Sequence, residues 1–190
     1  MLGLQEPGSR VMVSRSSNPK RKLPRTLELV DAKGTWVGVN TMRPNAVVAA
    51  LLQAGELPFK GSVQREVNVG KSRLDFFLPD CDTYLEVKNT TLAAGATAQF
   101  PDAVTSRGAR HMAELTQLAE NHHACVLFFI NRADCTHFDV ARHIDPAYAA
   151  ALEQARDAGV QVYPLGMSVD ETGFTMRGEL PTSWANLSAH

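Results

Sequence analysis

The chain has 190 residues, 44% hydrophobic and 21% charged, an ordinary globular composition that excludes disorder, collagen repeats and coiled coils for the whole chain. Its longest apolar run, Ala124 to Ile130, is far shorter than the roughly 20 residues of a membrane-spanning helix, so no membrane partner is expected. The three cysteines show neither a disulfide framework nor a metal-binding spacing. We therefore expect reduced thiols and a cytoplasmic protein.

Positive charge is concentrated near the N-terminus. Residues 1–43 hold eight basic and three acidic groups, and residues 44–190 hold eleven basic and seventeen acidic groups. This division, which the net charge of −1 conceals, favours a phosphate-binding surface beside a body that uses carboxylates. A solvated basic linker is the alternative interpretation.

The first region is typical of short strands joined by turns. Strands are expected at residues 10–13, 26–30 and 35–39, the last two joined by a hairpin turn at residues 31–34. Residues 14–25 are polar, basic and interrupted by two prolines, which excludes a regular helix there. Because this region is too short to bury a core alone, we place a domain boundary after Lys33. Residues 1–33 then form an N-terminal segment and residues 34–190 the main domain.

The rest of the chain alternates between helices and strands. Helices are expected at residues 46–52, from 103 or 105 to 120, and at 146–158. Strands are expected at residues 63–69, 72–78, 83–88, 126–130 and 160–163. Residues 89–101 are predicted to be a polar loop, and residues after about 166 a weaker tail. This order predicts an α/β fold with a mixed sheet flanked by helices on both faces.

Asp75, Glu86 and Lys88 are the most informative polar residues. Glu86 and Lys88 are two positions apart in an expected strand, so their side chains leave the same face. A tight hairpin can place Asp75 beside Glu86. Carboxylates are natural ligands for Mg²⁺, and a nearby lysine supplies a charge for a phosphate or a base for a water molecule. The alternative is an ordinary ion pair on a wet sheet face.

The segments that carry these residues resemble the core of PD-(D/E)XK nucleases. The matching segments are Ser72-Arg-Leu-Asp-Phe-Phe-Leu78 and Tyr84-Leu-Glu-Val-Lys88. More specifically, the chain is similar to the sugar fermentation stimulation protein A family. That similarity runs through Asn18 to Thr26, Gly38 to Thr41, Ser72 to Asp75, Glu86 to Asn89, Phe100 to Gly108 with His111, and Ala141 to Asp145.

The resemblance implies a restriction-endonuclease-like α/β core preceded by a barrel that resembles an oligonucleotide-binding (OB) fold. The chain is expected to begin inside that barrel, so residues 1–33 would be a partial, N-terminally truncated OB-like segment. The resemblance also implies that Asp75 and Glu86 bind Mg²⁺ or Mn²⁺, with the Val87 carbonyl as a third ligand. Lys88 would position or activate the nucleophile.

The resemblance suggests further site residues in the flanking segments. Glu66 and Asp102 would support the metal site from outside; the alternatives are a solvent-facing strand residue for Glu66 and a helix cap for Asp102. Arg107 and His111 are four positions apart on one helix face and would face a phosphate, with a surface position as the alternative for Arg107. Phosphate contacts are also expected from the basic residues Lys20, Arg21, Lys22 and Arg25.

The sequence therefore predicts a nuclease that depends on Mg²⁺ or Mn²⁺ and hydrolyses phosphodiester bonds in DNA, RNA or both, with weak sequence preference. The alternative is a DNA-binding regulator of sugar-metabolism genes that keeps the core without turnover. The carboxylates favour the nuclease, because a pure binder has little need of negative charge facing a polyanion. The sequence leaves open the choice between DNA and RNA, between single and double strands, and the oligomeric state.

Overall fold

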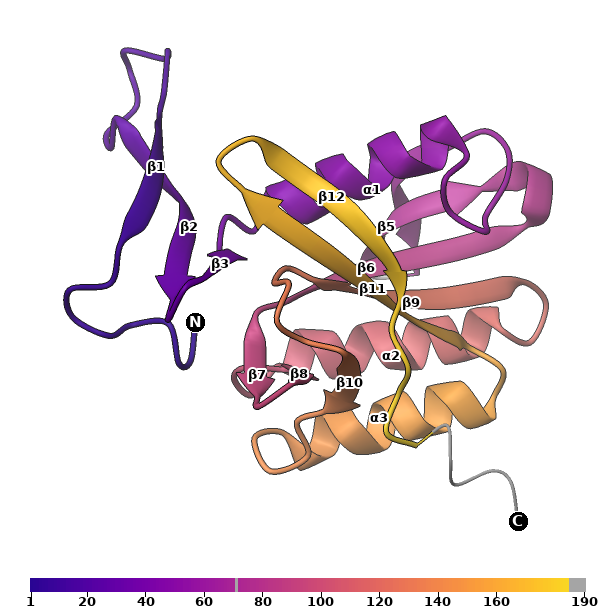
Figure 1. Ribbon diagram of the computed structural model, residues 1–190. Coiled ribbons are helices and arrows are strands. Elements are labelled where there is room, and N and C mark those ends of the chain that lie inside the picture. Colours follow the sequence, from indigo (N-terminus) through magenta and orange to yellow (C-terminus); the bar gives the residue numbers. More distant parts are fainter. Residues whose placement is uncertain (71, 185–190) are drawn as a thin grey trace.

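The computed structural model describes residues 1–70 and 72–184 (Figure 1). The chain begins with a three-stranded antiparallel sheet in the order β1-β2-β3. Its strands are β1 (Val11–Arg15), β2 (Arg25–Ala32) and β3 (Thr35–Gly38). The predicted hairpin turn at residues 31–34 joins β2 to β3. The proposed boundary after Lys33 lies in this turn, and β3 pairs with β2 on its other side.

A six-stranded mixed sheet forms the centre of the molecule, with the order β12-β11-β9-β6-β5-β4. Its strands are β4 (Gln64–Val69), β5 (Ser72–Leu78), β6 (Thr83–Thr90), β9 (His123–Ile130), β11 (Gln161–Asp170) and β12 (Gly173–Glu179). The three strands β6, β9 and β11 run parallel, and their neighbours at both edges run antiparallel. The short helix η1 (Pro79–Cys81) joins β5 to β6.

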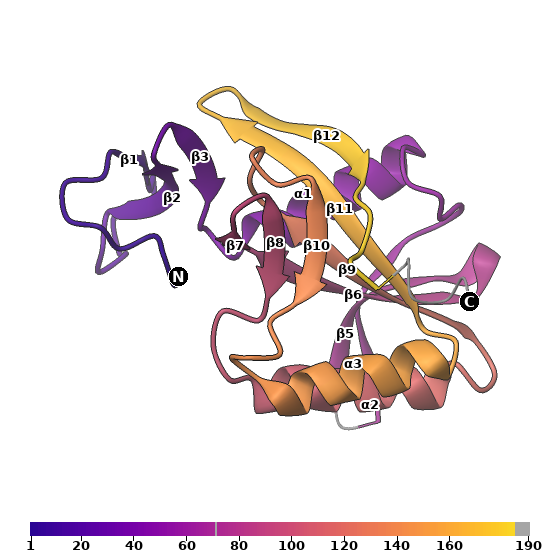
Figure 2. The same ribbon diagram turned by 60° about the horizontal axis from the view of Figure 1, so that its bottom comes forward.

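Helices cover both faces of this sheet, as Figure 2 shows. Helix α1 (Arg43–Ala54) packs on one face, and α2 (Ser106–Leu118) and α3 (Pro146–Asp157) pack on the other. Strand β9 lies between the two cores, and every residue from 124 to 130 is buried, as expected of an apolar run without alternation. The predicted mixed α/β fold is confirmed. No helix in the described ranges is long and apolar enough to cross a membrane.

Two predictions about secondary structure are wrong. The polar loop expected at residues 89–101 includes two short strands of a third sheet, which has the order β10-β8-β7. In that sheet, β7 (Leu92–Ala94) and β8 (Thr97–Phe100) lie in the expected loop, and β10 (His137–Val140) comes from later in the chain. The tail expected after residue 166 is the end of β11 and all of β12. Small residues and glycines weaken the strand signal in both places, and pairing with neighbouring strands compensates for it.

Both ends of helix α1 follow from its sequence. Pro44 lies in the first turn, where its missing N–H loses no hydrogen bond. Gly55 ends the helix in the left-handed conformation, with a φ of 70°, and its N–H donates to carbonyls of the last turn. The helix therefore places its first turn, with Asn45, close to β5.

Candidate functional site

The candidate site lies where β5 separates from β6. Their pairing runs from Leu78 and Thr83 to Phe76 and Leu85 and then stops. The next residue of β5, Asp75, contributes its side chain instead: its Oδ2 accepts a 2.8 Å hydrogen bond from the backbone N–H of Val87. This bond satisfies a backbone donor that has lost its strand partner, and it places the Asp75 carboxylate in the fork between the two strands.

Asn45 of α1 holds the other oxygen of this carboxylate. Its Nδ2 donates a 2.6 Å hydrogen bond to Asp75 Oδ1. The carboxylate is thus fixed from a strand on one side and a helix on the other. Each of its oxygens keeps a second lone pair, because a carboxylate has about four acceptor positions.

Glu86 and Lys88 project from β6 on the face covered by α2, as their spacing predicts. Lys88 Nζ lies 2.5 Å from Glu86 Oε1. The same oxygen is in very close contact with Nδ1 of His111, a buried residue of α2. The predicted ion-pair alternative is therefore present as a pair between neighbours on one strand, but it lies inside a larger buried cluster.

The two carboxylates of the site have pKa values that shift in opposite directions. Burial raises the pKa of Asp75 above its ordinary value, and the negative charge of Glu86 raises it further. Burial acts in the same direction on Glu86, but the hydrogen bond from His111 and the charge of Lys88 outweigh it. The pKa of Glu86 therefore lies below its ordinary value, and Glu86 is ionised at neutral pH.

His111 connects Arg107 to Glu86. Arg107 Nε donates to His111 Nε2 at 3.3 Å, and the opposite ring nitrogen contacts Glu86. Both contacts are satisfied together by the neutral ring that carries its proton on Nδ1. The predicted pair of Arg107 and His111 does share one side of α2. Only His111 is buried, however, and Arg107 lies exposed at the start of the helix.

The donor set of the site fits a divalent cation that keeps much of its water. The second carboxylate oxygen of Glu86, Oε2, is buried and has no hydrogen-bond partner among the described residues. A buried oxygen without a partner is costly unless a cation or water molecule satisfies it. No group of three or more His, Cys, Asp and Glu residues in the described ranges is arranged to hold a metal. Two carboxylates with water completing the shell is the arrangement typical of Mg²⁺.

Glu66 and Asp102 do not contact the two carboxylates. Glu66 lies across from Asp75 on β4, but its side chain is 66% exposed and pairs with Arg73 at 3.4 Å. Asp102 contacts the N-terminal amine of Met1. Asp102 also does not cap α2, because Thr105 fills that position and accepts a 3.0 Å hydrogen bond from Gly108 N–H. The described structure therefore gives neither residue a hydrogen bond or ion pair with the two carboxylates.

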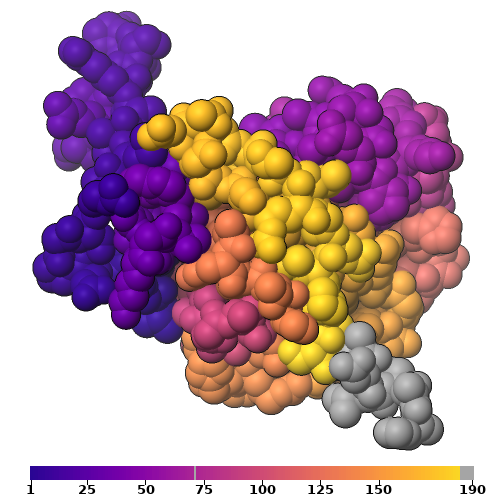
Figure 3. Space-filling view, viewed as in Figure 1, coloured from indigo at the N-terminus to yellow at the C-terminus, as the bar shows by residue number. Residues whose placement is uncertain are grey.

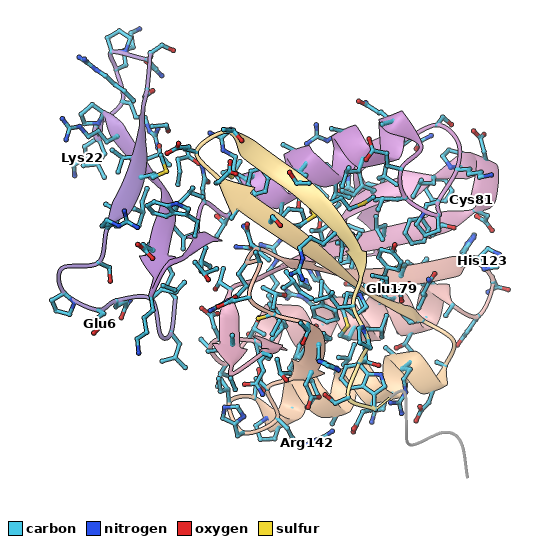
Figure 4. The ribbon with its side chains drawn as sticks, viewed as in Figure 1. Glu6, Lys22, Cys81, His123, Arg142 and Glu179 are labelled. Carbon is cyan, nitrogen blue, oxygen red and sulfur yellow. The ribbon has the colours of Figure 1, made fainter. Side chains whose placement is uncertain are left out.

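The predicted phosphate-binding residues Lys20, Arg21, Lys22 and Arg25 lie away from the fork. They are exposed on the β1–β2 hairpin and its loop, and Figure 4 labels Lys22 near the far end of that hairpin. Sequence reasoning missed one residue, Asn45. An amide one position after a first-turn proline, on the helix before a three-strand meander, is the signal that could have indicated it.

Comparisons with known proteins bear on both parts of the chain. The family model described as the SfsA N-terminal OB domain matches residues 1–39. The model described as the sugar fermentation stimulation protein RE domain matches residues 42–173, which include the fork. The chain belongs to the sugar fermentation stimulation protein (SfsA) family. The predicted fold, a restriction-endonuclease-like core after an OB-like segment, is confirmed.

Individual relatives agree with this assignment. The sugar fermentation stimulation protein homologue of Rhodospirillum centenum is 49% identical, over 91% of this chain and 78% of the relative. That of Synechococcus elongatus is 47% identical, over 95% of this chain and 80% of the relative. A solved structure of Pyrococcus furiosus SfsA in complex with Ca²⁺ is 26% identical, with a TM-score of 0.87 over 95% of this chain and 80% of that one. The OB-domain match begins at residue 1, so the expected truncation is not confirmed.

Proposed function

We propose that this SfsA-family protein is a nuclease that uses a divalent cation to hydrolyse phosphodiester bonds in nucleic acid. The observation that carries the proposal is the convergence of Asp75, Glu86 and Lys88 at the fork, with a buried Glu86 oxygen left without a partner among the described residues. The Pyrococcus furiosus relative was solved in complex with Ca²⁺, which supports a divalent cation here. We propose Mg²⁺ or Mn²⁺ as the ion that supports turnover.

Asp75 and Glu86 would hold the cation, with the Val87 carbonyl as a third ligand. When bound, such an ion supplies Lewis-acid stabilisation of phosphate charge and lowers the pKa of a coordinated water. Asn45 and the Val87 N–H fix the Asp75 carboxylate before any ligand arrives. That preorganisation reduces the rearrangement that binding requires.

The cations of the site have separate tasks. Lys88, which lies in the ion pair with Glu86, can donate to a phosphate oxygen or hold the attacking water in line. Arg107 presents an exposed guanidinium at the N-terminus of α2. The paired N–H donors of the guanidinium and the helix dipole both favour a phosphate there. His111 keeps Glu86 and Arg107 at fixed positions.

The polymer would reach the site through the basic N-terminal hairpin. The cations of this hairpin would contact backbone phosphates, which bind without regard to sequence. We therefore expect weak sequence preference. We propose DNA as the partner, with RNA as a second polymer to be tested in parallel.

The test is a cleavage assay on the purified chain with single-stranded DNA, double-stranded DNA and RNA, in Mg²⁺, in Mn²⁺ and in a chelator. We expect cleavage only with metal. Asp75→Asn and Glu86→Gln keep the shape of each side chain but remove its charge. Each should lower the rate by about 10²-fold or more. Calorimetric titration should show weaker metal binding by the double variant.

Glu66→Gln is the matched control. It removes a carboxylate one strand from Asp75 that pairs only with Arg73 in the described structure, so the cleavage rate should equal that of the parent. Unchanged metal affinity in the Asp75→Asn, Glu86→Gln double variant would overturn the assignment of these ligands. Binding without cleavage by the parent in either metal would contradict the nuclease and favour the non-catalytic regulator.

A further inference from the structure

The β1–β2 hairpin is a preformed projection of the surface. We call it the arm: strands β1 and β2 with the connecting residues 16–24. Figures 1 and 3 show it extending away from the rest of the molecule. Its connecting loop is held by hydrogen bonds from Ser16 N–H to the Pro24 carbonyl at 2.8 Å and from Arg21 Nη1 to Thr26 Oγ1 at 2.7 Å. The arm therefore presents a defined shape to a partner.

The cations of the arm are uncompensated. Arg15 and Arg25 lie directly opposite each other on the β1–β2 ladder, a pairing of like charges that destabilises a hairpin. Neither they nor the three basic residues of the loop form an ion pair within the described ranges, whereas Arg10 and Arg43 beside the arm each pair with a carboxylate. Repulsion of this kind is relieved when a polyanion binds.

Leu23 lies among these cations and is 68% exposed. It follows Lys22 and precedes Pro24, so an apolar side chain projects from the most basic part of the arm. Phosphate contacts do not require such a side chain. Architectural proteins, in contrast, insert apolar residues between base pairs from a basic surface and kink the duplex.

The arm lacks the exposed aromatic side chains with which proteins bind single-stranded nucleic acid. Proteins that bind single strands stack successive bases on exposed aromatic rings. Residues 16–25 contain no aromatic residue, and none of the large apolar side chains that are exposed in the described ranges is aromatic. Trp36 of the same sheet has the Arg10 guanidinium over its ring, 5.5 Å from the ring centre.

We propose that the arm enters a groove of double-stranded DNA and that Leu23 inserts between adjacent base pairs, opening the stack and bending the duplex. This inference rests on the proposed nucleic-acid binding and adds the form of the polymer and the way it is deformed. Figure 1 shows the loop end of the arm pointing away from β5 and β6, the two strands that form the fork. The distortion therefore lies away from DNA held at the fork.

The experiment uses the full chain and a DNA duplex of about 30 base pairs that carries a dye at each end and 2-aminopurine within the sequence. It is carried out in Ca²⁺ without Mg²⁺ or Mn²⁺. The parent should shorten the end-to-end distance, with a bend of about 20° or more, and raise the 2-aminopurine fluorescence as the stack opens. Leu23→Ser should bind the duplex with the parent's salt dependence, because all the cations of the arm remain, but should lose both signals.

Val11→Ser is the matched control. Val11 is a 51%-exposed apolar residue of the same arm, paired with Val30 at its base, and its variant should bend the duplex like the parent. A parent that binds without bending or unstacking, or a Leu23→Ser variant that does both, overturns the insertion alone. A parent that prefers single strands or duplex RNA over this duplex also overturns it. Failure to bind any nucleic acid overturns both the insertion and the proposed function.

Discussion

Glu86 is buried and ionised, and its two oxygens have different surroundings. Oε1 contacts both Lys88 and His111, whereas Oε2 has no partner in the described part of the chain. Two cationic or donor groups on one oxygen stabilise the charge, so the carboxylate does not need a ligand to remain ionised. The other oxygen stays available to one. This division allows a buried site to be both stable and ready to bind.

The role of Lys88 can be separated from affinity by a paired measurement. Lys88→Ala should keep most of the affinity for nucleic acid, because one charge among many contributes little to binding. The same change should lower the cleavage rate by about 10²- to 10⁴-fold, the range for positioned acid–base and electrostatic groups. Gel shift in Ca²⁺ and cleavage in Mg²⁺ measure the two effects.

The control for that measurement is Lys60→Ala, which removes an exposed lysine from the loop after α1. It should leave both quantities unchanged. Undiminished cleavage by Lys88→Ala would remove Lys88 from the mechanism.

The sequence predicted those residues of the candidate site whose placement follows from the alternation of side chains along a strand. Glu86 and Lys88 share a face because they are two apart, and the hairpin brings Asp75 to them. It did not reach the contact of Asn45 with Asp75, because that contact depends on how α1 crosses the sheet. It also could not assign Glu66, whose side chain turns to solvent although its position lies across from Asp75.

At the scale of elements, the charge of the arm can be measured through salt. Single neutralisations of Lys20, Arg21, Lys22 and Arg25 to Gln should each reduce the slope of log affinity against log salt, by about 0.7 to 0.9 for every phosphate that is no longer neutralised. Arg156→Gln, which removes an exposed cation already paired with Asp157 on α3, should not change the slope. If a variant with all four residues changed to Gln kept the slope of the parent, the arm would be only a solvated basic segment.

The first sheet meets α1 through Glu28. Its carboxylate accepts hydrogen bonds from Arg43, Ser14 and Asn40. The bond from Arg43 is the main reason that the pKa of Glu28 is lowered from 4.5 to about 2, against the opposing effect of burial. A carboxylate with a lowered pKa stabilises the fold fully above its unfolded pKa, and this stabilisation disappears as the pH falls through about 2.

Glu28→Gln should therefore lower the free energy of unfolding at pH 7 by about 1.5 kcal/mol, the low end for hydrogen bonds to charged groups because Arg43 is half exposed. The difference from the parent should shrink steadily as the pH falls from about 4.5 to 2. Urea unfolding at several pH values measures it. A difference as large at pH 2 as at pH 7 would show that the charge of Glu28 is not responsible.

Prediction of the elements succeeded where the residue pattern is strong in itself. The meander β4–β5–β6 and the buried strand β9 have alternating or continuous apolar runs with clear turns. Strands β7, β8 and β10 are three or four residues long and exist because they pair with one another. Pairing between segments that are distant in the chain cannot be predicted from the residue pattern within any one of them. In β12, the partly buried Phe174 and Met176 alternate with exposed residues, but two glycines obscure that signal.

At the scale of the whole molecule, the OB-like sheet is joined to the core by a close backbone approach. Gly38 of β3 donates a 3.0 Å hydrogen bond from its N–H to the Asn131 carbonyl, just after β9. A Cβ at Gly38 would lie only 2.1 Å from Asn131 Oδ1. The Asn131 side chain is fully buried and donates to Asn89 at 3.2 Å, so it cannot move aside without breaking that bond. Glycine at this position allows the two units to pack, and the arm is thereby held in place relative to the fork.

Gly38→Ala should therefore separate the two units before it unfolds the core. We expect the free energy of unfolding to fall by about 1 to 3 kcal/mol, as for overpacked sites, and limited proteolysis to cut faster between residues 39 and 42. The clash, rather than backbone strain, is the cause, so removing the obstruction should relieve it. Asn131→Ala combined with Gly38→Ala should be more stable than the sum of the single effects by about 0.5 to 3 kcal/mol. Strictly additive single effects would show that the two residues are not in conflict and that the sheet is held by other contacts.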